Sequence, residues 1–492
     1  MIRRTFITRT KSSPNWKHRD PNPLEKARRS AEGEWGMLNK NRIVSPLNKI
    51  VGNTNIISDP DKLKIYGVDG KVPKAVVFPG TIEEVSKLVA HANQHNLAIV
   101  PMGNGTKIGR GGVPKRVDVV LSTSRLRRMT DCDCDNLTLS AESGITLSEV
   151  QKSLAERGRG YFLPLDPPFT DKATLGGIVA TNSSGPKRLL YGTARDLIIG
   201  SKAVFPNGDI VASGGKTVKN VSGYDMCKLL IGSFGTLGIL CEMTFKLLPL
   251  PEKETTLLIP FPNLNNAVGF THEILHSQLI PSSMDILNAM AYKTLKCRIS
   301  IPPEASYLVA IGLEGIAESV ERQTVEMMER GKQQGALSGV TLDSEEHQAF
   351  WIALRDFSLA VTEIHPGFIA LKSNFLISRC EEMMRNCEET SARLGLECAL
   401  ICRSGSGILY SYILMGKKSR SESDVLIELI GNQTSGAVKN EGNLVVESCP
   451  LPLKQKVDVW GQPRSDYQIM RRLKGEIDPE GILNPGRFAG GI

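Results

Sequence analysis

The sequence lacks long apolar runs and paired cysteine motifs. No apolar run reaches the ~18 residues that a membrane-spanning helix needs, so we expect at most peripheral membrane contact. None of the ten cysteines forms a C-x-x-C pair, and the spacing of Cys132-Asp-Cys134 does not match the usual zinc or iron–sulfur sites. We therefore expect free thiols in a reducing compartment and no metal site.

The N-terminal head of the chain is basic and has no long apolar core. Met1–Ser30 contains nine Lys and Arg, against only Asp20 and Glu25 as acidic residues. This pattern does not resemble a secretory signal, and an organellar transit peptide is an alternative. We interpret residues 1–47 as a solvated basic arm and expect no nucleic-acid partner. The predicted localisation is cytoplasmic, with any association with the inner face of the membrane made through partner proteins.

The length and composition of the chain predict a globular protein with more than one domain. Its 492 residues exceed the roughly 250–300 at which single cores stop growing, so we expect roughly two to four domains. Hydrophobic residues make up 41% of the chain and charged residues 23%, which is typical of soluble proteins. The net charge of +8 is spread along the chain apart from the basic head.

A strand, a helix and a second strand lead into the first glycine-rich loop. The apolar run Lys74–Phe78 predicts a strand, and Thr81-Ile-Glu-Glu84 predicts a capping box at the start of a helix. The β pattern resumes at Ala98-Ile-Val-Pro101 and continues directly into Gly103-Asn-Gly105. A second capping box at Thr146–Glu149 completes a first α+β lobe.

The rest of the chain predicts a second lobe and an α+β cap. Ala203–Val211 favours a hairpin around its Asn-Gly pair, and Thr236–Leu247 predicts a closing pair of strands. From Glu252 onward strands and helices alternate, which favours helices on one face of a sheet. The expected cap strands are Thr255–Ile259, Tyr307–Leu313, Ile369–Ser373, Cys398–Cys402 and Ile408–Leu414, and the helices are Leu264–His276, Ser319–Gln333 and Cys380–Leu394. The predicted domains are a basic arm at 1–47, a two-lobed domain at 48–251 (lobes at about 48–160 and 161–251), a cap at 252–469 and a C-terminal segment at 470–492.

The first glycine-rich loop fits neither standard phosphate-binding fingerprint. In Gly103-Asn-Gly105-Thr-Lys-Ile-Gly109 the third glycine comes four residues after the second, whereas the Rossmann pattern needs three. A Walker A motif needs Gly-Lys followed by Ser or Thr, and here Thr106 separates Gly105 from Lys107. Successive backbone N–H groups can still form an anion nest, so the loop is either a pyrophosphate site or an ordinary tight turn.

The second lobe offers further surfaces for a flat phosphorylated ligand. Gly176-Gly177 permits close backbone approach, and Thr181-Asn-Ser-Ser184 supplies side-chain donors and acceptors. Arg195 and Asp196 form either a fixed charge pair at this site or a plain structural ion pair. Together with the first loop, these features predict a dinucleotide ligand.

Seven short motifs follow one another along the two lobes. They are Pro101–Thr106, Pro164–Pro167, Thr174–Gly177, Asn182, Gly192–Asp196, Gly223–Asp225 and Gly232–Gly238. In order and spacing they resemble the FAD-binding domain of the vanillyl-alcohol oxidase and para-cresol methylhydroxylase (PCMH) family, and Ile477–Arg487 resembles the family's C-terminal segment. Within the family, Lys216–Asp225 and Val457–Gly461 are most similar to the smaller FAD-binding subunit of bacterial glycolate oxidase.

The resemblance implies an α+β protein, with a two-lobed PCMH-type FAD-binding domain and an α+β, ferredoxin-like cap domain. It implies that the pyrophosphate of FAD lies on Gly103–Thr106 and that Asn484 and Arg487 lie near the reactive side of the flavin. The C-terminal segment would return to the flavin site. The implied cofactor-binding residues are Pro101, Gly103, Asn104, Gly105, Thr106, Pro164, Asp166, Pro167, Thr174, Gly176, Gly177, Asn182, Ala194, Arg195, Asp196, Gly235, Gly238, Ile239 and Asn484.

The sequence departs from the family in two places. Members that hold FAD covalently use a His or Cys in or near the first glycine loop, and Pro101–Gly112 contains neither, so non-covalent FAD is expected. The 2-hydroxyacid dehydrogenases of the family carry a His-rich motif for a divalent metal, where this chain has Cys402-Arg-Ser-Gly-Ser-Gly-Ile408. Those dehydrogenases carry a second His-bearing motif later in the chain, and near that position this sequence has Glu447–Leu451, which contains no His. Without these imidazoles no general base is evident.

The catalytic residues therefore remain unassigned, with Arg403, Arg195 and Arg487 as candidates. Arg403 is either a clamp for a carboxylate or an ordinary solvated arginine of the cap. Three functions fit the sequence. The first is a glycolate oxidase-type accessory subunit that takes part in oxidising a small 2-hydroxyacid beside a second FAD-binding subunit and an iron–sulfur subunit. The second is a self-sufficient FAD-dependent dehydrogenase of a small carboxylate or alcohol, and the third is a non-catalytic structural subunit of a redox complex.

Overall fold

The computed structural model describes residues 42–216, 224–295, 301–414, 422–462 and 464–492. The chain divides into two units, Met1–Pro46 and Leu47–Ile492. Of the first unit only residues 42–46 are described, and they are helical. Most of the predicted basic arm and residues 217–223 of one motif therefore lie outside the described residues.

The first lobe is built on a small, mainly parallel sheet. Its strand order is β1-β2-β4-β3, and β4 pairs in parallel with both β2 and β3. Thr81 caps the helix by accepting a hydrogen bond from the amide of Glu84, as predicted, but the Glu84 carboxylate accepts from the N–H of Gly80 instead of that of Thr81. The elements are β1 (Ile56–Ile57), β2 (Ala75–Val77), α3 (Ile82–Gln94), β3 (Ile99–Met102) and β4 (Val119–Ser122). The glycine-rich loop follows β3, at the carboxyl end of the parallel strands.

The second sheet is antiparallel and has the order β5-β6-β10-β8-β9. Its elements are β5 (Met129–Asp133), β6 (Thr138–Glu142), β8 (Ile198–Val204), β9 (Ile210–Gly214) and β10 (Ile239–Lys246), with α4 (Leu147–Glu156) and α5 (Leu175–Ala180). β8 and β9 form the predicted hairpin. β5 and β6 precede residue 160 but join this sheet, because β6 pairs with the distant β10. The strand pair predicted at Thr236–Leu247 is wrong: the segment has no turn residues in its middle and forms the single long strand β10.

The cap contains one eight-stranded antiparallel sheet made of two similar halves. Each half follows the order β-α-β-β-α-β and has the strand order 4-1-3-2. The first half is β12 (Lys253–Phe261), α9 (Leu264–Leu275), β13 (Ser283–Asn288), β14 (Tyr307–Gly315), α11 (Ala317–Gln333) and β15 (Val340–Asp343). The second is β16 (Ile369–Asn374), α14 (Cys380–Arg393), β17 (Glu397–Arg403), β18 (Ile408–Leu414), α15 (Glu422–Lys439) and β19 (Asn443–Ser448). The halves join where β13 pairs with β17.

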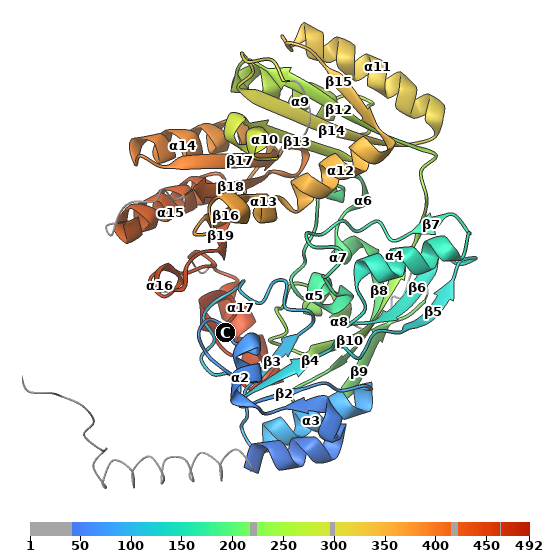
Figure 1. Ribbon diagram of the computed structural model, residues 1–492, viewed down its shortest axis with the longest axis vertical. Helices are drawn as coiled ribbons and strands as arrows, with labels where there is room; N and C mark the ends of the chain where they lie inside the picture. The colour runs from blue at the N-terminus through green and yellow to red at the C-terminus, as the bar shows by residue number, and fades with distance from the viewer. Residues whose placement is uncertain (1–41, 217–223, 296–300, 415–421, 463) are drawn as a thin grey trace, which may run out of the picture. The chain divides into compact units, whose positions relative to one another are not determined.

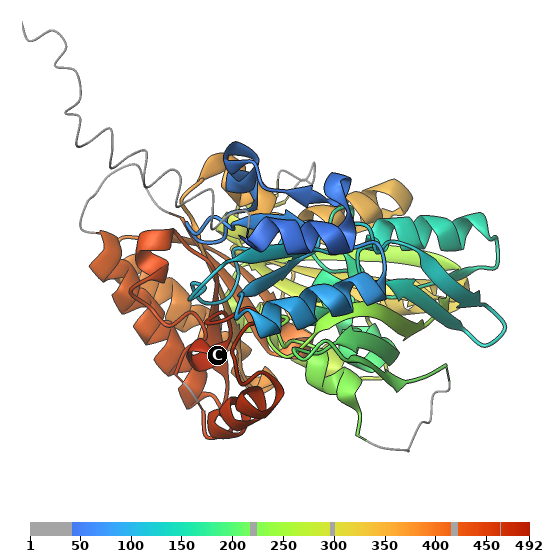
Figure 2. The same cartoon turned by 90° about the horizontal axis from the view of Figure 1, so that it is seen from below.

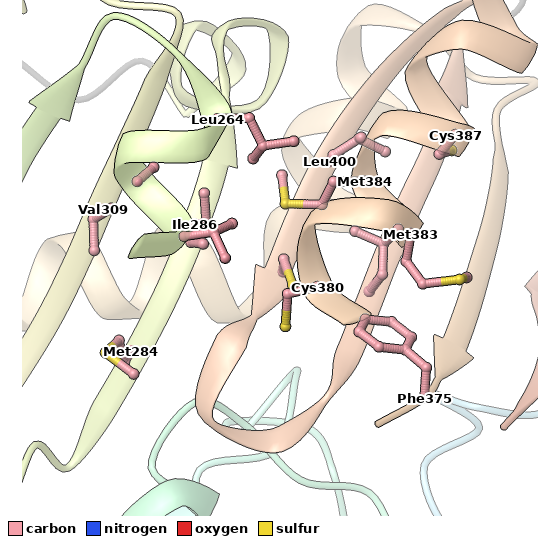
Figure 3. Packing of buried hydrophobic residues seen from close by; sticks show 14 of the residues in the cluster. Leu264, Met284, Ile286, Val309, Phe375, Cys380, Met383, Met384, Cys387 and Leu400 are labelled. Atoms are coloured by element: carbon pink, nitrogen blue, oxygen red, sulfur yellow. The ribbon is translucent and has the colours of Figure 1, made fainter. Parts of the chain in front are cut away.

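Helices cover both faces of the cap sheet. On one face α9, α11, α14 and α15 pack over a continuous apolar cluster, part of which, including Ile286, Leu400 and Met384, is drawn in Figure 3. The other face is partly covered by α10 (Ala289–Thr294), α12 (Ser344–Arg355) and α13 (Phe357–Ile364). The expectation that helices lie on one face alone is therefore wrong. Consecutive strand residues such as Leu257 and Leu258 point to opposite faces of the sheet, and both are apolar and buried, so both faces need a covering layer. Figure 1 shows α12 and α13 on the side turned toward α6 (Arg188–Tyr191).

The C-terminal segment lies against the first lobe. After α17 (Tyr467–Ile477), Leu483 forms a bridge with Ile99 of β3, and the amide of Asn484 donates to the Ile99 carbonyl at 2.8 Å. Figures 1 and 2 both show the end of the chain beside the strands of this lobe. Within the described ranges, no helix combines the length and apolarity needed to cross a bilayer.

Candidate functional site

A cleft in the two-lobed domain is lined by segments that are far apart in the sequence. The loop after β3 contributes one wall, α5 contributes another, and the C-terminal segment closes the cleft. Many of the residues implied by the resemblance meet here. They are Pro101, Gly103, Asn104, Gly105, Thr106, Thr174, Gly177, Gly235 and Asn484, together with Arg487.

The glycine loop presents unused backbone donors to this cleft. Among the described residues, the amides of Asn104, Gly105 and Thr106 have no hydrogen-bond acceptor, and Gly105 has the left-handed φ of +73°. A Cβ on Gly103 would lie 2.2 Å from Oγ1 of Thr174, the N-cap of α5. Gly103 is therefore required by close packing and Gly105 by its backbone conformation, and the free N–H groups fit an anion.

Two asparagines have unsatisfied side-chain acceptors: Asn484 lines the cleft, and Asn182 lines a neighbouring cavity. Asn182 and Asn484 have positive φ values of 44° and 47°. The Oδ1 atom of each is buried and has no hydrogen-bond partner in the part of the chain that is described. Nδ2 of Asn484 donates to the Phe234 carbonyl at 2.5 Å, which fixes the orientation of its amide. Buried acceptors are normally paired, so these oxygens fit N–H or O–H donors of a bound ligand.

A larger cavity of about 510 Å³ adjoins the cleft and extends to the cap sheet. Thr106, Lys107, Thr181 and Phe234 line both spaces, so a ligand in the cleft is directly accessible from the cavity. The cavity is rich in cationic side chains, namely Lys107, Arg110, Arg355, Lys372 and Arg403.

The two acidic side chains of the cavity lining are already paired. Asp69 accepts from Nζ of Lys454 at 2.7 Å, and Glu447 lies 2.8 Å from Nη2 of Arg110. The lining therefore carries an excess of positive charge, which favours a small anion as the occupant.

Arg403 is the most deeply buried of the cavity cations. Its side chain is 6% exposed, which excludes the solvated arginine that the sequence left open. Its guanidinium lies 5.0 Å from the centre of the Tyr410 ring, and Lys372 lies 5.7 Å from the same ring. Asp285 stands opposite Arg403 in the β13–β17 register. Burial raises the pKa of Asp285 to about 6, although the nearby Arg403 acts in the opposite direction.

Lys107 lies where the cleft and the cavity meet. Its Nζ is buried and has no hydrogen-bond partner among the described residues. Burial, followed by repulsion from Arg110, lowers the pKa of the Lys107 ammonium to about 7, while Glu447 and Asp356 act to raise it. The sequence reasoning used Lys107 only to reject a Walker A motif. Its place directly after the anion nest was the signal that could have identified it.

Several residues implied by the resemblance line neither space. They are Pro164, Asp166, Pro167, Gly176, Ala194, Arg195, Asp196, Gly238 and Ile239. Asp166 accepts hydrogen bonds from the amides of Gly185 and Lys187, and Asp196 belongs to the capping box of α7 (Ala194–Leu197). Arg195 is exposed and donates to the Lys228 carbonyl at 3.3 Å. These contacts give Asp166, Arg195 and Asp196 structural roles in their own loops and helices. The cofactor-binding roles of all nine residues remain predictions.

One metal-binding pattern in the sequence was missed. His272-Glu-Ile-Leu-His276 matches the His-Glu-x-x-His signature of zinc proteases. In the structure it ends α9, where Glu273 is engaged by Arg330 and Gln334. In the described ranges, no three or more His, Cys, Asp or Glu side chains form a group that could hold a metal ion.

Two family models match this chain. One, described as an FAD binding domain, matches residues 73–214, and the other, described as the C-terminal domain of FAD linked oxidases, matches residues 250–488. The chain belongs to the FAD-linked oxidase family. It is an FAD-dependent oxidoreductase, and the recognition of the PCMH-type fold from sequence motifs is confirmed.

Curated relatives of this FAD-linked oxidase cover most of its length. Glycolate oxidase subunit GlcD of Bacillus subtilis is 29% identical over 422 residues, which is 85% of this chain and 89% of the relative. The mitochondrial D-lactate dehydrogenase [cytochrome] of Arabidopsis thaliana is 26% identical, with 93% and 81% of the two chains covered. The solved structure of p-cresol methylhydroxylase has a TM-score of 0.73 at 17% identity, covers 91% of this chain and 96% of its own, and shows the fold.

The cleft of this FAD-linked oxidase fits the cofactor of its family. The free amides of Asn104, Gly105 and Thr106 suit the pyrophosphate. The unsatisfied Oδ1 atoms of Asn182 and Asn484 suit donors on the flavin ring. A nucleotide cofactor would therefore fill the hydrogen-bonding positions that the protein leaves open.

Proposed function

We propose that this FAD-linked oxidase takes part in oxidising a small 2-hydroxyacid, as an FAD-binding subunit of a multi-subunit redox complex. The observation that carries the proposal is the cavity beside the FAD cleft, in which unpaired cations outnumber the acidic groups. Its volume of about 510 Å³ suits a small molecule. Relatives are named for glycolate, D-lactate and D-2-hydroxyglutarate, all of which are small 2-hydroxycarboxylates.

FAD would be held without a covalent bond. The lining of the cleft contains neither a histidine nor a cysteine that could form such a bond. The free amides of the glycine loop would bind the pyrophosphate, and Asn182 and Asn484 would orient the ring. When bound, FAD accepts a hydride from a substrate carbon. The cations of the cavity would bind the substrate carboxylate and hold the substrate next to the cleft.

The subunit role has two supports. GlcD of Bacillus subtilis, which is similar to 85% of this chain, is itself named as a subunit of glycolate oxidase. The cavity lining contains no histidine, so the usual general base for a hydroxyl proton is missing from it. A second FAD-binding subunit and an iron–sulfur subunit would then complete the complex. A self-sufficient dehydrogenase is the second candidate, and it is favoured by the open cavity next to the cleft.

Anaerobic titration of the purified chain separates these candidates. The visible spectrum first shows whether flavin is bound, and acid precipitation should release the flavin into the supernatant if it is non-covalent. Glycolate, D-lactate and D-2-hydroxyglutarate are then added without oxygen. A yellow protein that they reduce only after the partner subunits are added supports the accessory role. Bleaching of the isolated chain would establish the self-sufficient enzyme instead, and a preparation that binds no FAD would leave the structural role.

A further inference from the structure

The metal motif of the family's 2-hydroxyacid dehydrogenases has no counterpart in this cavity. The corresponding segment, Cys402–Ile408, contains the end of β17 and the turn into β18, and its Arg403 lines the cavity. The lining includes no histidine, and the carboxylate of Glu447 is engaged by Arg110. Divalent metals of this kind need imidazole and free carboxylate ligands, so the residues present do not fit a metal ion.

A buried guanidinium stands at this position instead. Arg403 makes no hydrogen bond among the described residues, and its Nε and Nη1 are buried. By contrast, Nη2 of the buried Arg487 in the neighbouring cleft donates to the carbonyls of Ile108 and Arg110, while its Nε and Nη1 are unpaired in the described ranges, like those of Arg403. An arginine that served only to hold the fold together would use its donors on such carbonyls. Arg403 lines the cavity, and its buried Nε and Nη1 have no hydrogen-bond acceptor among the described residues.

The described residues around Arg403 stabilise its positive charge but accept no hydrogen bonds from its guanidinium. The Tyr410 ring lies 5.0 Å from the guanidinium and supports it by a cation–π contact. Asp285 faces it from the other half of the cap, and both oxygens of that carboxylate lack hydrogen-bond partners among the described residues. Asp285 and Arg403 thus interact electrostatically, but no hydrogen bond joins them in the described part of the chain.

We propose that Arg403 takes the place of the divalent metal and binds the carboxylate of the small 2-hydroxyacid directly. The protein then binds its anionic ligand with no metal ion. A guanidinium is permanently charged, and its planar fork matches a carboxylate through two parallel hydrogen bonds. The inference rests on the proposed function for the identity of its ligand.

Calorimetric titration with oxalate, a non-reactive dicarboxylate, tests the inference. The FAD-loaded protein is dialysed against EDTA, its metal content is measured by mass spectrometry, and oxalate is then titrated into the wild type and into the variants Arg403→Gln and Arg403→Lys. Arg393→Gln is the matched control, because Arg393 is an exposed cap arginine on α14 that pairs with Glu428 at 2.8 Å. Circular dichroism and flavin content check the fold of each variant.

Oxalate should bind the metal-free wild type and the control with equal affinity, and Arg403→Gln should weaken it about tenfold or more. Arg403→Lys keeps the charge and loses the fork, so its affinity should fall between the two. If Arg403→Gln does not fold, the Arg403→Lys comparison decides. Three results would overturn the inference. They are oxalate binding that returns only after a divalent metal is added, oxalate binding that is unchanged in both variants, and no oxalate binding by the wild type. Reduction of the flavin by hydroxyacids is scored separately, so the proposed function can fail or stand on its own.

Discussion

Replacing Lys474 with Met should loosen the C-terminal segment and release FAD. Nζ of Lys474 donates to Asp478 at 2.5 Å and to the carbonyls of Thr236 and Leu483 at 2.7 and 3.0 Å. Asp478 in turn accepts from the amides of Ile482 and Leu483. This network fixes the turn that places the following residues over the FAD cleft.

The expected loss follows from burial of the ion pair. The side chains of Lys474 and Asp478 are only 11% and 0% exposed. Removing one partner of a buried pair leaves the other charge uncompensated, which costs about 3–5 kcal/mol. Lys439→Met is the control, since Lys439 pairs with Glu382 while 76% exposed, and such surface pairs contribute about 0–1 kcal/mol. In the double variant Lys474→Met/Asp478→Asn part of the loss should be recovered, because the isolated charge is gone.

Urea titration followed by FAD fluorescence measures this difference. FAD release should occur at a lower urea concentration in Lys474→Met than in Lys439→Met, and limited proteolysis should cut the C-terminal segment earlier. Equal midpoints for the two single variants, with an unchanged digestion pattern, would refute the idea that the buried pair holds the segment in place.

Three further changes have defined expected results. Gly103→Ala should abolish FAD retention, measured as the flavin-to-protein ratio, because its Cβ would lie 2.2 Å from Thr174 Oγ1, whereas Gly109→Ala, whose Cβ meets nothing within 4 Å, should retain flavin. Oxalate affinity should fall from about pH 6 to about pH 8, because Lys107 loses its charge above its pKa of about 7 and Asp285 gains charge above its pKa of about 6, and Lys107→Met should reduce this pH dependence to the part that comes from Asp285. Thr146→Ala should destabilise the FAD-binding domain by about 1 kcal/mol in thermal unfolding, because it removes the cap of α4, and an unchanged melting temperature would contradict this.

Local signals in the sequence were sufficient for most of the individual elements. The capping box at Thr146 and the apolar spacing after Thr81 both mark helix starts that the structure contains. Pairing over long distances was not visible, because the β6–β10 ladder joins Glu142 to Glu242 and no local pattern encodes that contact. For the same reason the duplication within the cap was missed. Its strand β13 was not predicted, although Pro281 precedes it and its last residue, Asn288, caps α10.

The candidate site was predictable where glycine and asparagine motifs form it. Gly103, Gly105 and Asn484 line one cleft, and their cofactor-binding roles remain predictions from the resemblance. The charge state and partners of a side chain depend on burial, which the motifs do not contain. The sequence could therefore identify Arg403 as a candidate but not its burial, and it marked Lys107 only by its position directly after the glycine loop.

The junction between the two halves of the cap has a mechanical consequence. β13 and β17 are joined over only three residue pairs, whereas β12 and β14 share nine. Asp285 and Arg403 form one of these three pairs. The cation that lines the cavity therefore lies in the shortest ladder of the sheet. Separation of the β13–β17 ladder would move Arg403 away from Asp285 and disrupt the proposed anion site, while each half could keep its own hydrogen-bonded strands.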